Sequence, residues 1–202
     1  MRLEDLNALN EEAATREFLR CCGSTQWARE MAASRPFDST ETMAQASDTI
    51  SLSLGRADWL EAFAAHPRIG ADAAAPAATP SGLPRGVSDG SRRGWGPGAS
   101  AEKVDGSLRT EWATQEQSGV ASAPDEVRAR LAASNRAYEA RFGYIFIVCA
   151  TGKSAGEMLA LLDERLTNDP DEELHIAAEE QRKITRLRLA KLLDAPQAAK
   201  GS

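Results

Sequence analysis

The sequence has little of what a nucleic-acid-binding or membrane-spanning protein needs. Its 202 residues include 24 Lys and Arg against 30 Asp and Glu, which gives a net charge of −6. Nucleic-acid binding requires a basic surface that displaces counterions from phosphates, so we expect no nucleic-acid partner. No apolar run approaches the ~18 residues of a spanning helix, and the N-terminus lacks a signal-peptide pattern, so we expect no membrane partner.

Cysteine is scarce as well. The chain has three, at Cys21, Cys22 and Cys149. Two adjacent cysteines and a distant third do not make a disulfide framework. We expect all three to be reduced and mostly buried, which is typical of a cytoplasmic protein.

Strand-forming β-branched residues are also few. Val and Ile together number 11, whereas Ala occurs 37 times. Alanine has the highest helix propensity, while β-branched residues favour strands. The composition therefore predicts an all-α fold, and the length fits a single compact helical domain over residues 1–202.

One segment differs in composition from the rest. Residues 71–108 hold 7 of the 15 Gly and 4 of the 9 Pro, and they show no sustained apolar period. Such a stretch buries too little to offset the entropy of ordering it, so it is predicted to be a long flexible insertion loop. Residues 195–202 are predicted to be a disordered tail.

Helical periodicity and capping residues account for most of the remainder. We expect N-caps at Asn10, at Ser24 or Thr25 and at Ser154, and a C-cap at Gly143. Pro124 is expected at the first position of its helix, and Leu187 on the buried face of the last one. The expected helices lie within 10–22, 24–34, 40–54, 112–117, 124–143, 154–166 and 169–193.

The run Tyr144 to Ala150 is continuously apolar. Periodicity does not distinguish a buried strand from the start of a buried helix here, so both remain open. Two nearby patterns carry no site. Gly152-Lys153-Ser154 lacks the earlier glycine of a phosphate-binding loop. His175 and Glu179 share a helix face without a third ligand at diagnostic spacing, so we expect no metal.

His66 is the first candidate for chemistry. It follows an amphipathic helix and precedes residues 71–108, in the motif His66-Pro67-Arg68-Ile69-Gly70. Imidazole titrates near neutrality, so it can give or take a proton. A single histidine at a helix end is more often structural, and both interpretations stand at this point.

Three other candidates are weak when taken one at a time. Glu116 could orient an imidazole or bind a polar ring, but a solvated helix face is commoner. Phe146 to Ala150 could form the wall of a site, but plain core is commoner. Arg188, between two leucines, could hold a carboxylate in a two-pronged contact, but a surface arginine with its stem on apolar neighbours is the default.

In their order along the chain, these segments resemble the OHCU decarboxylase family. That family acts on 2-oxo-4-hydroxy-4-carboxy-5-ureidoimidazoline in the conversion of urate to allantoin. The resemblance covers nearly the whole chain except 71–108 and the C-terminal tail. The motifs are Cys22-Gly23-Ser24-x-x-Trp27, Arg35-Pro36-Phe37, His66-Pro67-Arg68-Ile69-Gly70, Glu116-Gln117, Asn135-x-x-Tyr138-x-x-Arg141-Phe142-Gly143-Tyr144-x-Phe146-Ile147, Arg165-Leu166-x-Asn168, Glu173-Leu174 and Leu187-Arg188-Leu189.

The resemblance implies an all-helical enzyme, usually a homodimer, that needs neither a metal nor an organic cofactor. It would remove the substrate carboxylate as carbon dioxide and give (S)-allantoin. By resemblance, His66 is the proton donor and Glu116 its partner in the site. The positions implied to contact the substrate are Pro67, Ala113, Thr114, Gln115, Gln117, Phe146, Ile147, Val148, Cys149, Ala150 and Arg188, with Arg186 as a nearby alternative to Arg188.

This chain departs from the family in two places. Ala113 stands where the family commonly has serine, so a hydroxyl contact is lost that Thr114 or water could replace. Residues 71–108 form an unusually long connection, either a mobile cover over the substrate or a tolerated surface insertion. Two rival hypotheses follow: a catalytically silent relative that only binds the ligand, and a helical interaction protein that docks through Trp95.

Overall fold

The computed structural model describes residues 1–69, 112, 115 and 123–194, and the regular secondary structure of these residues is entirely helical. The all-α prediction is therefore confirmed. The helices are α1 (Leu3–Ala8), α2 (Glu11–Cys21), α3 (Thr25–Ala33), α4 (Thr40–Ser53), α5 (Arg56–Ala64), α8 (Asp125–Phe142), α9 (Ala155–Arg165) and α10 (Pro170–Asp194).

Side chains cap the N-termini of α2, α3, α4 and α9. The Asn10 side chain accepts the Ala13 amide at 2.8 Å, and Ser24, not Thr25, caps α3. Ser154 and Glu157 form a reciprocal capping box at the start of α9. Gly143 ends α8 with a φ of 80°, a left-handed conformation that favours glycine. These predictions are confirmed.

Four expectations need correction or completion. Pro124 is the N-cap of α8 and not its first residue, because its ψ of 146° is extended. Leu187 is 37% exposed, since the helix turns Arg188 and Leu189 inward in its place. Tyr144 to Ala150 is neither strand nor helix. Of the helix expected at 112–117, Trp112 and Gln115 are helical and the other residues lie outside the described part of the chain.

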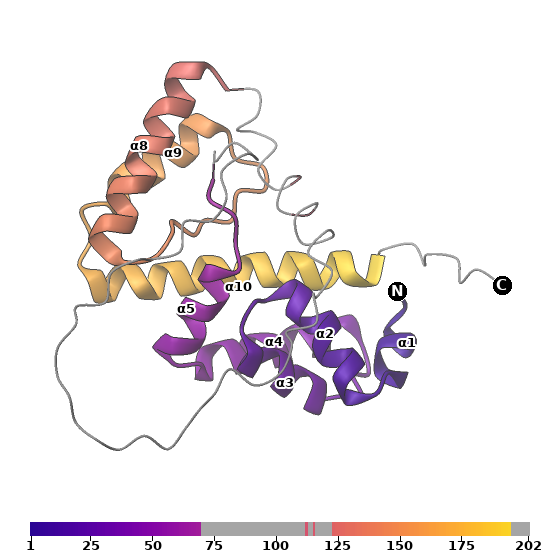
Figure 1. Ribbon diagram of the computed structural model, residues 1–202. Helices are drawn as coiled ribbons and strands as arrows, with labels where there is room; N and C mark the ends of the chain where they lie inside the picture. Colours follow the sequence, from indigo (N-terminus) through magenta and orange to yellow (C-terminus); the bar gives the residue numbers. More distant parts are fainter. Residues whose placement is uncertain (70–111, 113–114, 116–122, 195–202) are drawn as a thin grey trace, which may run out of the picture.

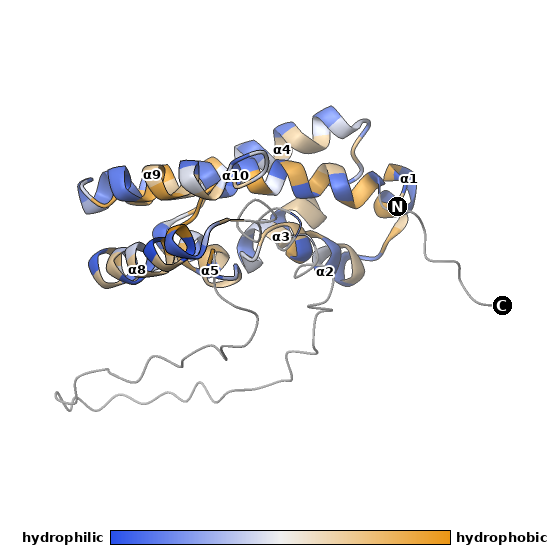
Figure 2. Ribbon diagram, turned by 90° about the horizontal axis from the view of Figure 1, so that it is seen from above, coloured by the Kyte–Doolittle hydropathy of each residue, from blue (hydrophilic) through white to orange (hydrophobic). Residues whose placement is uncertain are grey.

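Helix α10 runs across the whole molecule and joins its two parts (Figure 1). Helices α8 and α9 pack together beside its N-terminal half, while α1 to α4 gather near its C-terminal half. The N-terminus returns to the far end of α10, where the Met1 amine donates to the Leu192 carbonyl at 2.7 Å. Figure 2 shows apolar residues concentrated on the inward faces of the helices.

Two apolar cores meet along this helix. The first core joins α1 to α4 with Leu189 and Leu192 of α10. The second core joins α5, α8, α9 and the Tyr144–Ala150 segment with Leu174, Ala177 and Ile184 of α10. The half-buried Trp59 packs against both. The candidate site residue Arg188 lies on α10 between Ile184 of the second core and Leu189 of the first.

Candidate active site

His66 follows α5 in a segment that is fixed on both sides. Its amide donates to the Phe63 carbonyl at 3.0 Å, and its side chain is half-buried with Nε2 shielded from solvent. The buried Asn135 of α8 donates to the Ile69 carbonyl at 3.0 Å. Arg68 makes a two-pronged ion pair with Glu139 of α8, at 2.6 and 2.9 Å. These contacts hold the segment that carries His66 between α5 and α8.

The junction between α2 and α3 lies directly against the end of α5. A Cβ atom added to Gly23 would lie 2.2 Å from the Cβ of Ala65, closer than real side chains approach. Only glycine therefore permits this contact. It brings Cys22 and Gly23 beside the residue that precedes His66.

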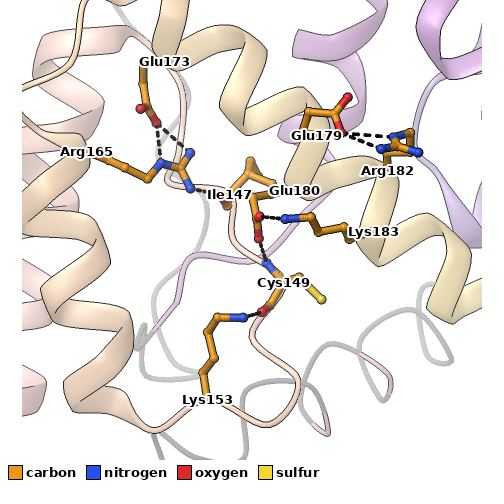
Figure 3. Close-up of polar contacts among 9 residues, drawn as sticks. All are labelled: Ile147, Cys149, Lys153, Arg165, Glu173, Glu179, Glu180, Arg182 and Lys183. Atoms are coloured by element: carbon orange, nitrogen blue, oxygen red, sulfur yellow. Dashed lines mark hydrogen bonds and ion pairs between the residues drawn. The ribbon is translucent and has the colours of Figure 1, made fainter.

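The Phe146–Ala150 segment is buried apart from Cys149, which is half-buried. Charged side chains take the place of a ladder of backbone hydrogen bonds (Figure 3). Arg165 donates to the Ile147 carbonyl at 2.8 Å. Glu180 of α10 accepts the Cys149 amide at 2.7 Å, while Lys153 donates to the Cys149 carbonyl at 2.8 Å.

A buried cluster of polar side chains around Arg165 supports the Phe146–Ala150 segment. Arg165 and Glu173 form an ion pair at 2.6 Å with side chains 8% and 0% exposed. Asn168 donates to the same carboxylate at 2.8 Å, and Tyr138 donates to it as well. Burial, together with the Glu173 carboxylate, raises the pKa of Tyr138 far above its ordinary value, so the phenol keeps its proton and remains a donor.

The central part of α10 presents polar side chains to the interior. Gln181, Thr185 and Arg188 are 5%, 1% and 2% exposed. Their spacing of four and three residues places them on one helix face. The default expectation of a surface arginine is wrong for Arg188. Arg186 is exposed and pairs with Asp48 at 2.7 Å.

Trp112 links the candidate segment 112–117 to this region. It is 9% exposed in the first core, with the Arg20 guanidinium 5.5 Å from its ring centroid. Gln115 is exposed, as is Pro67. The remaining predicted positions of this segment lie outside the described residues: Ala113, Thr114, Glu116 and Gln117.

The structure thus brings several predicted segments to α10. Phe146–Ala150 is bound to it through Glu180. The end of α5 reaches it through Gly23 and Cys22, since Gln181 Nε2 lies 4.0 Å from Cys22 Sγ. Arg188 is part of it. Glu180, Gln181 and Arg188 of α10 thus connect, directly or through Cys22 and Gly23, to the segments that carry the apolar wall and His66.

Sequence analysis assigned no role to four residues that shape this region: Glu180, Gln181, Arg165 and Glu173. A signal for Gln181 was present, because polar residues at 181, 185 and 188 interrupt an otherwise apolar helix face. Arg165 and Glu173 stood out only as members of the family motifs, and their pairing was not predictable because it depends on the turn between α9 and α10.

A separate pocket of about 180 Å³ lies between α4, α5 and α10. Its lining includes Leu52, Trp59 and His175 and none of the predicted site residues. Within the described ranges, no group of three or more His, Cys, Asp or Glu side chains is placed to hold a metal ion. No helix in that part of the chain is long and apolar enough to cross a membrane.

A family model for OHCU decarboxylase matches residues 7–82 and 99–190. The chain belongs to the OHCU decarboxylase family. The resemblance inferred from the motifs is confirmed. The family match includes the chain both before and after residues 83–98.

The similar proteins give the family assignment finer detail. The Uric acid degradation bifunctional protein TTL of Arabidopsis thaliana is 40% identical over 176 residues, which are 87% of this chain and 46% of that protein. The 2-oxo-4-hydroxy-4-carboxy-5-ureidoimidazoline decarboxylase of Amia calva is 38% identical over 82 residues, 41% of this chain and 47% of that protein. The matched region thus spans about half the length of these curated relatives.

Two solved structures share the fold. A crystal structure of OHCU decarboxylase in the presence of (S)-allantoin is 33% identical, with a TM-score of 0.64, covering 89% of this chain and 99% of that one. A crystal structure of (S)-allantoin synthase is 18% identical with a TM-score of 0.61, covering 98% of this chain and 56% of that one, and supports the fold alone.

Proposed function

We propose that this protein decarboxylates 2-oxo-4-hydroxy-4-carboxy-5-ureidoimidazoline to (S)-allantoin without a cofactor. The observation that carries the proposal is the family match on both sides of residues 83–98. A solved relative, crystallised in the presence of (S)-allantoin and matched over 99% of its length, adds support.

The chemistry explains why side chains suffice. When carbon dioxide leaves, the electron pair of the broken carbon–carbon bond passes to the adjacent imine of the substrate. The imine nitrogen takes up a proton, the hydroxyl gives one up as it becomes the ring carbonyl, and a ring carbon takes up one further proton. The balance is substrate carboxylate plus one proton giving allantoin plus carbon dioxide. The intermediate is planar, so only an acid held on one face yields a single enantiomer.

In this proposal His66 is the acid that delivers that proton. The half-buried position of its side chain, in a segment that Asn135 of α8 binds, supports this role. Glu116 orients the imidazole or acts on the substrate hydroxyl. Arg188 holds the departing carboxylate or a ring carbonyl, a contact suited to a planar guanidinium.

The remaining predicted residues surround the ring in the same proposal. Phe146 to Ala150 supply an apolar wall, and the side chains of Arg165 and Glu180 bind its backbone. The other proposed contacts are Pro67, Ala113, Thr114, Gln115 and Gln117.

We further propose that the protein is a cytoplasmic homodimer. The three cysteines, two of them buried, form no disulfide, which suits a reducing compartment. The dimer follows from the family resemblance, and light scattering of the purified protein measures it directly. A monomer at micromolar concentration would contradict it.

The decisive experiment generates the substrate in situ from urate and follows allantoin chirality by circular dichroism. We expect wild type to give (S)-allantoin, whereas unassisted decay gives both enantiomers. His66→Asn and Glu116→Ala should each lower the rate at least ~100-fold, a typical contribution of a general acid. His175→Asn, at the other histidine of the chain, is the matched control and should keep full activity.

Two outcomes contradict the proposal. Full activity of either site variant would remove the role of that residue. Binding of allantoin by wild type without any acceleration would support a silent relative, in which the loss of the serine hydroxyl at Ala113 has abolished turnover.

A further inference from the structure

Gln181 has a polar atom that the protein itself leaves without a partner. Its side-chain oxygen Oε1 is buried, and no donor among the described residues lies within hydrogen-bond reach of it. The residue as a whole is 5% exposed. Buried acceptors are nearly always satisfied, so an exception calls for a physical reason.

The orientation of this amide is fixed by its neighbour. The Thr185 hydroxyl donates its single proton to the Gln181 backbone carbonyl at 2.9 Å. Its oxygen can then only accept, and it accepts from Gln181 Nε2 at 3.1 Å. The NH₂ group therefore points to Thr185 and Cys22, and the oxygen points away from both.

The position of Gln181 relates it to the candidate site. It shares a face of α10 with Arg188, two turns away and about 10 Å along the axis. It also touches Cys22, whose neighbour Gly23 packs against the residue before His66. The Gln181 oxygen, an acceptor, and the Arg188 guanidinium, a cation, thus lie on one face of α10. The segment that carries His66 is linked to this face through Gly23 and Cys22.

We propose that Gln181 is a specificity-determining residue whose Oε1 accepts an N–H of the ureido group of the substrate. The inference rests on the proposed function. Arg188 takes the carboxylate or carbonyl of the ring, so the group that reaches two turns further along α10 is the ureido substituent. A urea offers N–H donors, which is the chemistry that a buried amide oxygen lacks here.

The proposal predicts an unusual combination of effects for Gln181→Met. Methionine keeps the length of the side chain and removes the unsatisfied oxygen together with the hydrogen bond from Nε2 to Thr185, so the two effects offset and the melting temperature should change little. The KM should nevertheless rise about tenfold or more, with kcat changed less than about threefold, because a binding contact is lost. A purely structural role would instead lower the melting temperature.

Two companion variants sharpen the test. Gln181→Glu keeps an acceptor oxygen and should hold the KM within about threefold of wild type. Ser47→Ala removes another buried hydroxyl without a partner among the described residues, on α4 in the first core, and should leave KM and kcat unchanged. If the glutamate variant does not fold, the methionine variant decides.

Binding measurements separate this proposal from the proposed function. Gln181→Met should weaken (S)-allantoin binding about tenfold while leaving binding of hydantoin, the same ring without the ureido group, unchanged. Equal effects on both ligands, or no effect on either, would overturn the assignment. Absence of turnover in wild type would overturn the proposed function, and the comparison of the two ligands would still decide for Gln181.

Discussion

At the scale of single residues, two arginines on α10 have opposite environments. Arg188 is 2% exposed, whereas Arg186 lies on the surface and pairs with Asp48. Side chains two residues apart on a helix point in directions about 200° apart, so only one of these two arginines can face the interior. Arg188 is the one of the two that faces the interior, and it is therefore the one that we propose as the substrate contact.

The substitutions Arg188→Lys and Arg186→Lys should therefore differ sharply. Lysine cannot make a two-pronged contact, so Arg188→Lys should lower kcat/KM about 10- to 100-fold, as expected for a lost charge-assisted hydrogen bond. Arg186→Lys keeps the surface charge and should stay near wild type. Steady-state kinetics with substrate generated in situ measures both. Equal losses, or a greater loss at Arg186, would reverse the assignment.

Arg188 also shows where prediction from sequence ends at this scale. Its leucine neighbours favour a surface arginine, and only the resemblance argued otherwise. Burial of a charge depends on groups from distant parts of the chain, which periodicity does not report. By contrast, Phe18, Trp27 and Met31 are buried on the inward faces of α2 and α3, and helical spacing alone accounts for them.

At the scale of elements, features set by neighbouring residues were predictable from the sequence, whereas features set by distant contacts were not. The caps at Asn10, Ser154 and Gly143 depend on residues within one turn, so the sequence specified them. The Tyr144–Ala150 segment could not be assigned, because its backbone is held by side chains of α9 and α10. Its apolar composition indicated burial correctly and gave no information on conformation.

The buried ion pair behind this segment should be important for stability. Glu173→Gln leaves the Arg165 charge without its carboxylate in a nearly water-free site. We expect a loss of about 3–5 kcal/mol in the free energy of unfolding, the usual cost of breaking a buried pair. Urea denaturation measures this loss. The matched control Glu12→Gln breaks an exposed pair with Arg16 and should cost less than about 1 kcal/mol.

Glu180 should contribute to the pH dependence of stability. Burial opposes its ionisation, but hydrogen bonds from Lys183 and the Cys149 amide outweigh burial and lower its pKa below the ordinary 4.5. A lowered folded-state pKa stabilises the protein above the unfolded value, and this contribution is lost as the pH falls through the folded value.

The advantage of wild type over Glu180→Gln should accordingly be largest at neutral pH. It should shrink as the pH falls below the ordinary glutamate value of 4.5. Urea midpoints measured across that range test the effect, with Glu179→Gln on the same turn as control. A difference between wild type and Glu180→Gln that stays constant with pH would contradict the role of the ionised carboxylate.

At the scale of the whole molecule, α10 belongs to both cores, and the candidate site lies where they meet. The chain order of the motifs predicted the family, and the family predicted the fold. The meeting of the segments on α10 was not predictable from composition or period. It depends on contacts such as Gly23 with Ala65, which join residues 42 positions apart in sequence.

The family match also bears on the long Gly- and Pro-rich segment at this scale. The family model pairs residues 71–82 and 99–108 with family positions and passes over 83–98. The stretch without a family counterpart is thus shorter than the whole 71–108 segment. It contains Trp95, on which the hypothesis of an interaction protein depends.

Deleting residues 83–98 separates a cover over the substrate from a tolerated insertion. Because the family motifs do not include this stretch, we expect kcat/KM within about threefold of wild type and an unchanged melting temperature, as for a surface insertion. A cover would exclude water and complete the site, so its removal would lower kcat/KM about tenfold or more at the same melting temperature. Trp95→Ala in the full chain is the companion variant. If it abolishes capture of a partner while leaving turnover intact, the tryptophan serves docking and not catalysis.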